Sequence, residues 1–412
     1  MKFMKKQLFA TVLAAFSLIA SLSFGQAAEA PRGSAWSKSP AVPKDAMAAG
    51  VVDVRRAMSG ATDILDLLRK NLPPDISQPI EELDMSIKDV KAEFAQKGFN
   101  LDDVEWCMLV VGICNDVGAN TIKKKIRQIE NIGFVLCMKD TSRVKEFIEA
   151  FSQKPPKVQR IAGAEVLSVE NLRFYIGDDN FSVWGVNVCV VDENQVVVVP
   201  MKYDHWDSDK GESVYAANEQ TIKALVRACR GYGKSEDRFA PLANLEDGIC
   251  ARGIMPEIGG LADRLGLREL VSDAIRRSGD ADLENTVFKM GSLDVDVQLA
   301  SETSWCEGRL TLATENDARQ LYSLLSSCDL LWRAALDTGM IALSYNMEEI
   351  KDDLVREGFP KGCAARLEDV ARVTRREVSD AVKASISGKT VTLAFKLPVR
   401  RIVTAAAAEF GK

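Results

Sequence analysis

One polar segment holds the residue types best suited to bind a ligand. It is KYDHWDSDKGE, residues 202–212, and it follows the apolar run Val196–Val199. An aromatic ring can stack on a sugar or a peptide while neighbouring polar groups bond to it. The candidate ligand-binding residues are Tyr203, Asp204, His205 and Trp206. Two other interpretations are a solvated acidic loop and a Trp206 that folds over the adjacent strand as a lid on the core.

The same segment carries carboxylates that suit Ca²⁺, which prefers oxygen ligands. The candidate metal ligands are Asp204, Asp207, Asp209 and Glu212. Their spacing departs from the EF-hand pattern, in which the glycine stands one position further from the first aspartate than Gly211 does here. A Ca²⁺ site is therefore a minority hypothesis beside the solvated loop.

Other site chemistries find little support. The single histidine, His205, excludes zinc sites built from several histidines and weakens any Ser-His-Asp or Cys-His proposal. Gly388-Lys389-Thr390 does not complete a phosphate-binding loop, because Lys383 stands where the first glycine is required. No motif points to a cofactor. A pair of catalytic carboxylates stays open, since 59 acidic residues allow many pairs and only their separation in space decides.

The N-terminus has the pattern of a signal peptide over residues 1–30. Three lysines form a basic start, residues 8–24 are mostly apolar, and GQAAEA offers small residues for cleavage. Residues 31–45 are rich in Pro, Ser and charge and read as a flexible lead-in. We expect an exported protein, periplasmic or extracellular, with no transmembrane segment after the signal peptide is removed.

The charge narrows the possible partners. The whole chain has a formal net charge of −6, and removing residues 1–30, with three lysines and Glu29, brings it to −8. An acidic protein repels phosphate backbones, so nucleic-acid binding has little support. A protein or a glycan is the expected partner.

The nine cysteines do not have the spacing of a disulfide framework. Their number is odd, no CxxC occurs, and most lie in apolar periodic segments, where a cysteine behaves as a small buried hydrophobe. We expect most of them to be reduced.

Two strand–helix units suggest an internal repeat. In NIGFVLCMKDTSRVKEFIEAF, Asp140 is the expected helix cap and Val144, Phe147, Ile148 and Phe151 form one helix face. In GRLTLATENDARQLYSLLSSCDLLW, the expected cap is Asp317, and the matching face is placed 177 positions later: Leu321, Leu324, Leu325 and Cys328.

The pattern of the remaining segments completes the expected architecture. Apolar runs and turn residues predict strands at about 158–169, 172–176, 181–191 and 196–199 and at 391–397, while residues 346–384 read as helical. The predicted fold is α+β, with two related halves over residues 46–232 and 238–412, each an antiparallel sheet packed by amphipathic helices.

Three segments resemble an uncharacterised family of large exported bacterial proteins of the Planctomycetes–Verrucomicrobia type. They are AVPKDAMAAGVVDV, LTLATENDARQLYSLL and GKTVTLAFKLP. The resemblance implies export and duplicated α+β halves, and it transfers no catalytic residue.

The sequence supports two hypotheses of function. The first is an exported, non-enzymatic protein that works by binding or by envelope assembly. The second is a secreted hydrolase that uses carboxylates on an envelope or extracellular polymer. A deep cleft with convergent acids would favour the hydrolase, and a packed interior would favour the binding protein.

Overall fold

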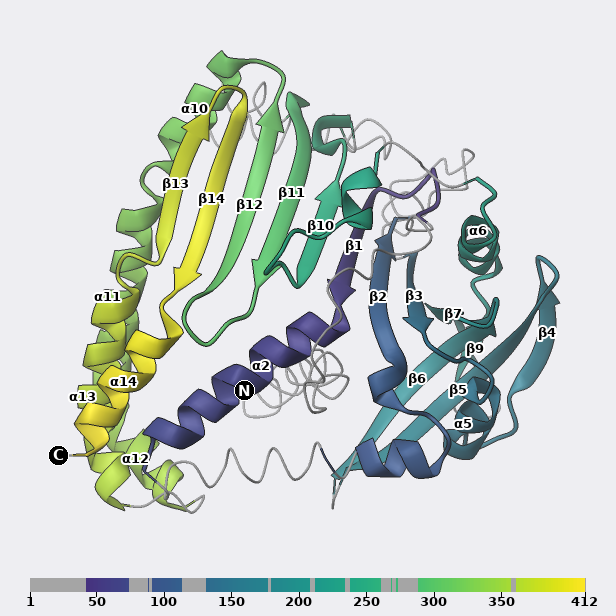
Figure 1. Cartoon of the computed structure of the whole chain (residues 1–412), viewed down its shortest axis with the longest axis horizontal. Coiled ribbons are helices and arrows are strands. Elements are labelled where there is room, and N and C mark those ends of the chain that lie inside the picture. The colour runs from purple at the N-terminus through teal and green to yellow at the C-terminus, as the bar shows by residue number, and fades with distance from the viewer. Residues whose placement is uncertain are drawn as a thin grey trace.

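A computed structural model describes residues 42–73, 88, 91–112, 131–176, 179–207, 212–233, 238–260, 268, 272, 288–356 and 361–411. Within them, twelve strands form one antiparallel sheet in the order β13-β14-β12-β11-β10-β1-β2-β3-β7-β6-β5-β4, and β8 and β9 form a separate two-stranded ribbon (Figure 1). The predicted α+β class is confirmed. The two halves do not have separate sheets, because their strands join into one.

The strands of the described residues are β1 (Ala48–Asp53), β2 (Val104–Val111), β3 (Ile132–Met138), β4 (Lys157–Ile161), β5 (Ala164–Ile176), β6 (Asp179–Val190), β7 (Gln195–Pro200), β8 (Lys202–Asp207), β9 (Glu212–Ala216), β10 (Ala251–Met255), β11 (Met290–Gln298), β12 (Ser304–Leu312), β13 (Val382–Ser387) and β14 (Thr390–Leu397). The helices are α2 (Val54–Asn71), α5 (Val144–Phe151), α6 (Glu219–Cys229), α10 (Glu315–Leu325), α11 (Cys328–Tyr345), α12 (Met347–Arg356), α13 (Lys361–Val378) and α14 (Val399–Phe410), with short 3-10 turns η1 (Leu101–Asp103) and η2 (Ala240–Ala243).

The strand order repeats on either side of the β1–β10 pair. Moving outward, β1, β2, β3, β7 and β6 are matched by β10, β11, β12, β14 and β13. In both halves a helix follows the third strand of this series, and the last two strands form a hairpin. The halves differ in what precedes that hairpin, which is β4 and β5 in the first half and α11, α12 and α13 in the second. The sheet is therefore built from two units of one topology.

The repeat has a different offset from the one predicted. The buried residues of α5 are Val144, Phe147, Ile148 and Phe151, as expected. In α10 the inward face is Ala318 and Leu321, with Tyr322 and Leu325 packed beside them. These pairs lie 174 positions apart, from 144 to 318 and from 147 to 321. The predicted offset of 177 is therefore wrong. It placed Leu324 on the core face, whereas that side chain is 51% exposed.

The predicted caps are also wrong by nearly one helical turn. Asp140 accepts from the backbone N–H of Ser142 at 2.8 Å, whereas the residue before α5 is Arg143. Asp317 lies inside α10, and its N–H donates to the Oγ1 of Thr314, the true N-cap. The Oγ1–H of Thr314 donates in turn to Asp317 Oδ2 at 2.5 Å. Serine and threonine compete with aspartate for this position, and the sequence offered both.

The two faces of the sheet carry different cores. On one face of the first half, α6 and η2 cover a cluster that includes Val51, Met108, Val135 and Val197. On the other face, α5 packs on Leu167 and Val188, and α10 packs on Leu312 and Val391 of the second half. Because α5 and α10 occupy the same face of the sheet, their placement follows the repeat.

Helix α2 links the halves. It starts directly after β1, and its far end packs through Leu67 on Val399 and Val403 of α14 (Figure 1). On its way α2 passes close to the backbone at Leu299. Gly60 permits this approach, since an ideal Cβ there would lie only 2.2 Å from the carbonyl oxygen of Leu299. The helix thus clamps the first half to the end of the second.

Three local predictions differ from the structure. The strand predicted at about 158–169 is divided between β4 and β5 by a turn at Ala162 and Gly163, which both have positive φ. The helical segment predicted to reach 384 ends at Val378, and β13 follows. In the segment 202–212, predicted as a loop, residues 202–207 form β8 and Glu212 begins β9, which pairs with it.

Two further features concern the cysteines and membrane-spanning helices. Cys107, Cys189, Cys229, Cys250, Cys306 and Cys328 are free thiols, consistent with the expectation that most cysteines are reduced. Cys328 begins α11 and does not lie on the core face of α10. Across the described ranges, no helix is both long and apolar enough to cross a bilayer. The expected signal peptide lies outside the described residues.

The corrected repeat makes a stability prediction. Leu321→Ala removes a side chain that is 6% exposed and should lower the free energy of unfolding by about 2–4 kcal/mol. Leu324→Ala, the matched control, should change it by less than about 0.5 kcal/mol. Urea unfolding followed by circular dichroism measures both, and equal losses would contradict the 174-residue offset.

Candidate functional site

The pairing of β1 with β10 forms the seam between the halves. Four residue pairs make it, and at its middle Gly50 lies opposite Gly253. Since side chains alternate along a strand, Val51 and Arg252 point to one face of the sheet, and the two glycines lie on the other. The seam therefore presents one charged side and one apolar side.

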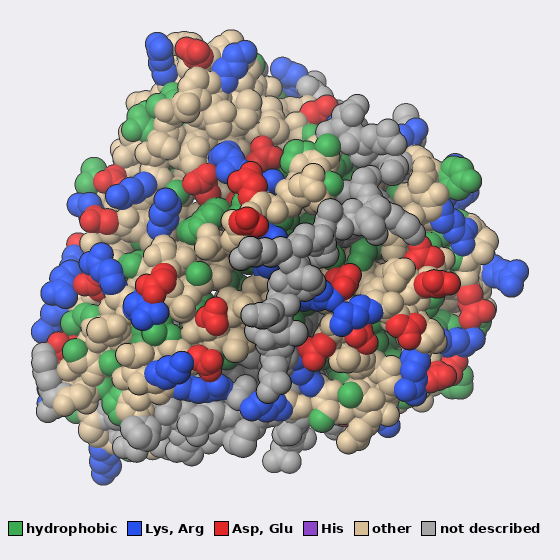
Figure 2. All heavy atoms as spheres, viewed as in Figure 1, with side chains coloured by type: hydrophobic (Ala, Val, Ile, Leu, Met, Phe, Trp, Pro, Cys, Tyr) green, Lys and Arg blue, Asp and Glu red, His purple; other side chains and the backbone are tan. Residues whose placement is uncertain are grey.

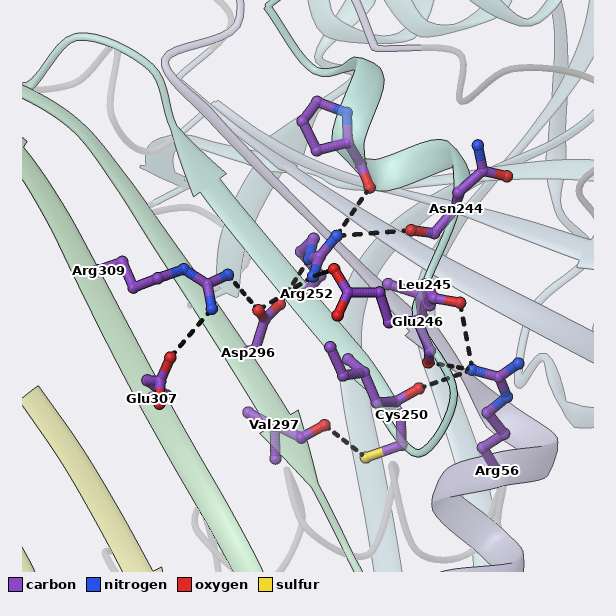
Figure 3. Close-up of polar contacts among 12 residues, drawn as sticks. Arg56, Asn244, Leu245, Glu246, Cys250, Arg252, Asp296, Val297, Glu307 and Arg309 are labelled. Carbon is purple, nitrogen blue, oxygen red and sulfur yellow. Dashed lines mark hydrogen bonds and ion pairs between the residues drawn. The ribbon is translucent and has the colours of Figure 1, made fainter. Parts of the chain in front are cut away.

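The charged side is a cluster of Arg252, Asp296, Glu307 and Arg309 (Figure 3). Asp296 is fully buried and accepts from Arg252 Nε at 2.5 Å and from Arg252 Nη2 at 3.0 Å. Arg309 donates to the same carboxylate and to Glu307 Oε1 at 3.0 Å. A carboxylate between two guanidinium groups is satisfied on both oxygens, so this cluster is built to hold three strands together.

The pKa values of the two aspartates on β11 move in opposite directions. Burial alone would raise the pKa of Asp296, but the hydrogen bonds from Arg252 and Arg309 outweigh it and hold that pKa below its usual value. Burial raises the pKa of Asp294, and the positive charge of Arg309 offsets this increase only in part. Asp296 therefore remains ionised at neutral pH, and Asp294 is the more easily protonated of the two.

A third arginine, Arg56, fastens the connector that leads into β10. Arg56 Nη1, from α2, donates to the carbonyl oxygens of Glu246 at 2.8 Å and Ile249 at 3.1 Å (Figure 3). Arg252 Nη2 lies 3.6 Å from Glu246 Oε1. These contacts hold the connector against the seam, so the charged side is closed by protein as well as by its own ion pairs.

The apolar side of the seam holds a pocket of about 280 Å³, here called the seam pocket. Its wall is almost wholly apolar and comes from β1, β2, β3, β10, β11 and the start of α2. The lining residues are Gly50, Val51, Val52, Val54, Ala57, Cys107, Leu109, Phe134, Ala251, Arg252, Gly253, Val295 and Val297. The volume is near the lower end of small-molecule sites, which span about 300–1,000 Å³.

Gly253 explains the open space of the pocket, and Cys107 indicates its lack of reactivity. An ideal Cβ on Gly253 meets no described atom within 4 Å, so the missing side chain leaves space. Burial raises the pKa of the Cys107 thiol to about 11, and the thiolate needed for nucleophilic attack is therefore scarce at neutral pH. The pocket offers contact with hydrocarbon and no reactive group.

The predicted ligand-binding residues lie elsewhere, on the β8–β9 hairpin. Tyr203 pairs with Tyr215, His205 with Val214, and Trp206 with Ser213, with a register shift between Tyr203 and His205. Asp204 lies within β8. The backbone is thus a ribbon and not the loop expected, while ligand binding by these residues stays a prediction.

The predicted metal ligands share this hairpin. Asp207 ends β8 opposite Glu212, the first residue of β9, whereas Asp209 lies outside the described residues. Among the side chains that were described, no three His, Cys, Asp or Glu residues are grouped so that they could hold a metal ion. Ca²⁺ binding at the hairpin stays a prediction.

Two features of the sequence are typical of the seam, although neither of them identifies it without the fold. Gly50 and Gly253 stand inside apolar strands, where a glycine often marks a close backbone approach. Asp294 and Asp296 alternate with apolar residues in LDVDV, which is typical of a strand with one polar face. Pairing these segments required the fold.

Comparison with known proteins adds little. No family model and no curated protein matches the chain. It is similar to two solved crystal forms of TP0453: form I at 10% identity and a TM-score of 0.37, covering 90% of this chain and 96% of that one, and form IV at 8% identity and the same TM-score, covering 91% and 99%. Similarity at this level supports no inference about the present chain.

The buried ion pair should matter far more than an exposed one. Asp296→Ala leaves Arg252 buried without its partner and should cost about 3–5 kcal/mol of unfolding free energy. Glu368→Ala removes the exposed pair with Arg372 on α13 and should cost less than about 1 kcal/mol. Chemical unfolding measures both, and a loss at Asp296 no larger than the loss at Glu368 would refute the role assigned to the cluster.

The opposite pKa shifts predict opposite pH effects. The lowered folded-state pKa of Asp296 means that its ionised form stabilises the fold above the unfolded-state pKa, about 3.9, and that this contribution is lost as pH falls through the folded pKa. Asp294, with a raised pKa, gains relative stability as pH falls. Urea midpoints measured between pH 6 and 2 should therefore fall less steeply in Asp296→Asn than in the wild type, and more steeply in Asp294→Asn.

Proposed function

We propose that this chain is an exported, non-enzymatic binding protein of the cell envelope that holds a hydrocarbon chain in the seam pocket. The observation that carries the proposal is the pocket itself, which is walled by apolar atoms at the centre of the sheet. The signal-peptide pattern of residues 1–30 supports export, and the hairpin residues 203–206 remain a candidate second contact.

The chemistry of the wall selects the ligand class. A sugar or peptide buried there would leave its hydroxyl or amide groups without hydrogen bonds, at a cost of about 1–3 kcal/mol each. A hydrocarbon loses no hydrogen bonds and gains about 25 cal/mol for each Å² removed from water. The geometry therefore favours an acyl chain or a similar apolar group over the glycan expected at the hairpin.

The competing hydrolase requires two carboxylates facing one cleft. The seam pocket is lined by no carboxylate, and a second pocket, between α6 and residues 43–45, is lined by one, Asp45. Asp294 and Asp296 lie on the same face of β11, but Asp296 is committed to two arginines. This arrangement supports the binding protein over the hydrolase.

Filling the pocket should abolish binding. Gly253→Val places three carbons in the open space beside Gly253 and should weaken binding of N-phenyl-1-naphthylamine, an apolar fluorescent probe, by at least about tenfold, because the ligand and the new side chain need the same volume. Titration of the mature chain followed by probe fluorescence measures the affinity, and dodecanoic acid should displace the probe.

The matched control is Gly308→Val. Gly308 lies on the same face of the sheet in β12, outside the pocket lining, where an added Cβ makes only ordinary contacts at 3.9 Å. It should leave the probe affinity within about twofold of the wild type. Probe binding that survives Gly253→Val unchanged would exclude the seam pocket as the binding site.

A further inference from the structure

A second pocket lies away from the seam, on the outer flank of α6. Its volume is about 360 Å³, and its lining includes Lys44, Asp45, Gln220, Lys223, Arg227 and Tyr232. Gln220, Lys223 and Arg227 follow one another at helical spacing along α6, so they share one face of that helix. This basic pocket has a different chemistry from the seam pocket.

The walls of the basic pocket are fixed by the backbone. The N–H of Lys44 donates to the carbonyl oxygen of Gly233 at 3.0 Å, and the N–H of Tyr232 donates to that of Arg227 at 2.8 Å. The opposite face of α6 is anchored in the core by Ile222 and Leu225, which are fully or almost fully buried. A ligand would therefore meet a preformed concavity, which lowers the entropy cost of binding.

The charges in this pocket are not balanced. Lys44, Lys223 and Arg227 face a single carboxylate, Asp45. None of the three forms an ion pair with a carboxylate of the described residues, whereas many other exposed cations do, such as Lys145 with Glu165 at 2.9 Å. Three such cations in one concavity of a chain with net charge −6 form a local attraction for an anion.

The remaining lining residues suit the organic part of such an anion. Tyr232 is 66% exposed and offers an aromatic face, on which a ring can pack. The side-chain amide of Gln220 can bond hydroxyl groups. Lysine and arginine are the side chains that bind phosphate most strongly, through charge-assisted hydrogen bonds.

We propose that the basic pocket binds a phosphate group carried by a small hydroxylated compound or by a lipid head group. Lys44, Lys223 and Arg227 hold the phosphate, and Tyr232 flanks the part that carries it. The site is independent of the seam pocket, so it can be tested whether or not the apolar ligand is found.

Calorimetric titration of the mature chain with glycerol 3-phosphate and with inorganic phosphate, at low salt, tests the proposal. The wild type should bind, and Lys223→Gln/Arg227→Gln should raise the dissociation constant at least about tenfold. Lys70→Gln/Lys383→Gln removes the same charge from two exposed lysines outside the pocket and should leave it within about twofold. Because all four side chains are exposed, thermal unfolding should be unchanged in both variants.

A second arm separates the two sources of phosphate. Flotation with vesicles of phosphatidylglycerol in phosphatidylcholine should capture the wild type, and not the pocket variant, if the phosphate belongs to a lipid; binding in solution without capture by vesicles identifies a soluble compound. Absence of binding in both arms overturns the proposal. Equal losses in the pocket and control variants also overturn it, because they would show a non-specific charge effect.

Discussion

The antiparallel pairing of β1 with β10 is the constraint on which the rest of this structure depends. Only four residue pairs form it, yet it turns two five-strand units into parts of one twelve-strand sheet. Polar contacts surround it, with the buried Asp296 held by two arginines and the connector before β10 held by Arg56. The seam pocket lies where this pairing places Gly50 opposite Gly253, and the space that a side chain on Gly253 would fill is empty.

The repeat is preserved in the backbone and relaxed in the side chains. At the seam Gly50 pairs with Gly253, and next to them Val51 of the first unit pairs with Arg252 of the second. One unit has an apolar side chain where the other has the arginine that organises the charge cluster. In Figure 2, acidic and basic side chains are interspersed over the visible face, with no broad patch of one sign. The face shown therefore carries charges of both signs.

Short-range patterns predicted much of the fold. The apolar run at 196–199, the helix face that begins at Val144 and the alternating segment before Pro398 predicted β7, α5 and β14 with small errors at their ends, because burial imposes a period that can be read from one segment. The turn at Ala162 and Gly163 was missed, since alanine seldom adopts positive φ and gives no turn signal. The joining of the halves was also missed, because which strands become neighbours depends on contacts far apart in the chain. For the same reason local composition identified residues 203–206 as a candidate site. The seam pocket could not be identified in this way, because its wall is formed by alternate residues of five strands.

The shared sheet also decides what would happen if the halves were separated. Each unit would then present an unpaired strand, Ala48–Asp53 in one and Ala251–Met255 in the other. Both strands are short, and their row of exposed N–H and C=O groups would be flanked by an apolar surface, which is the combination that templates aggregation. A proteolytic cut in the connector between α6 and β10 would not by itself release either edge, because β1 and β10 would remain hydrogen-bonded and α2 would remain packed on α14. Each of these two strands therefore protects the other from aggregation by pairing with its exposed edge.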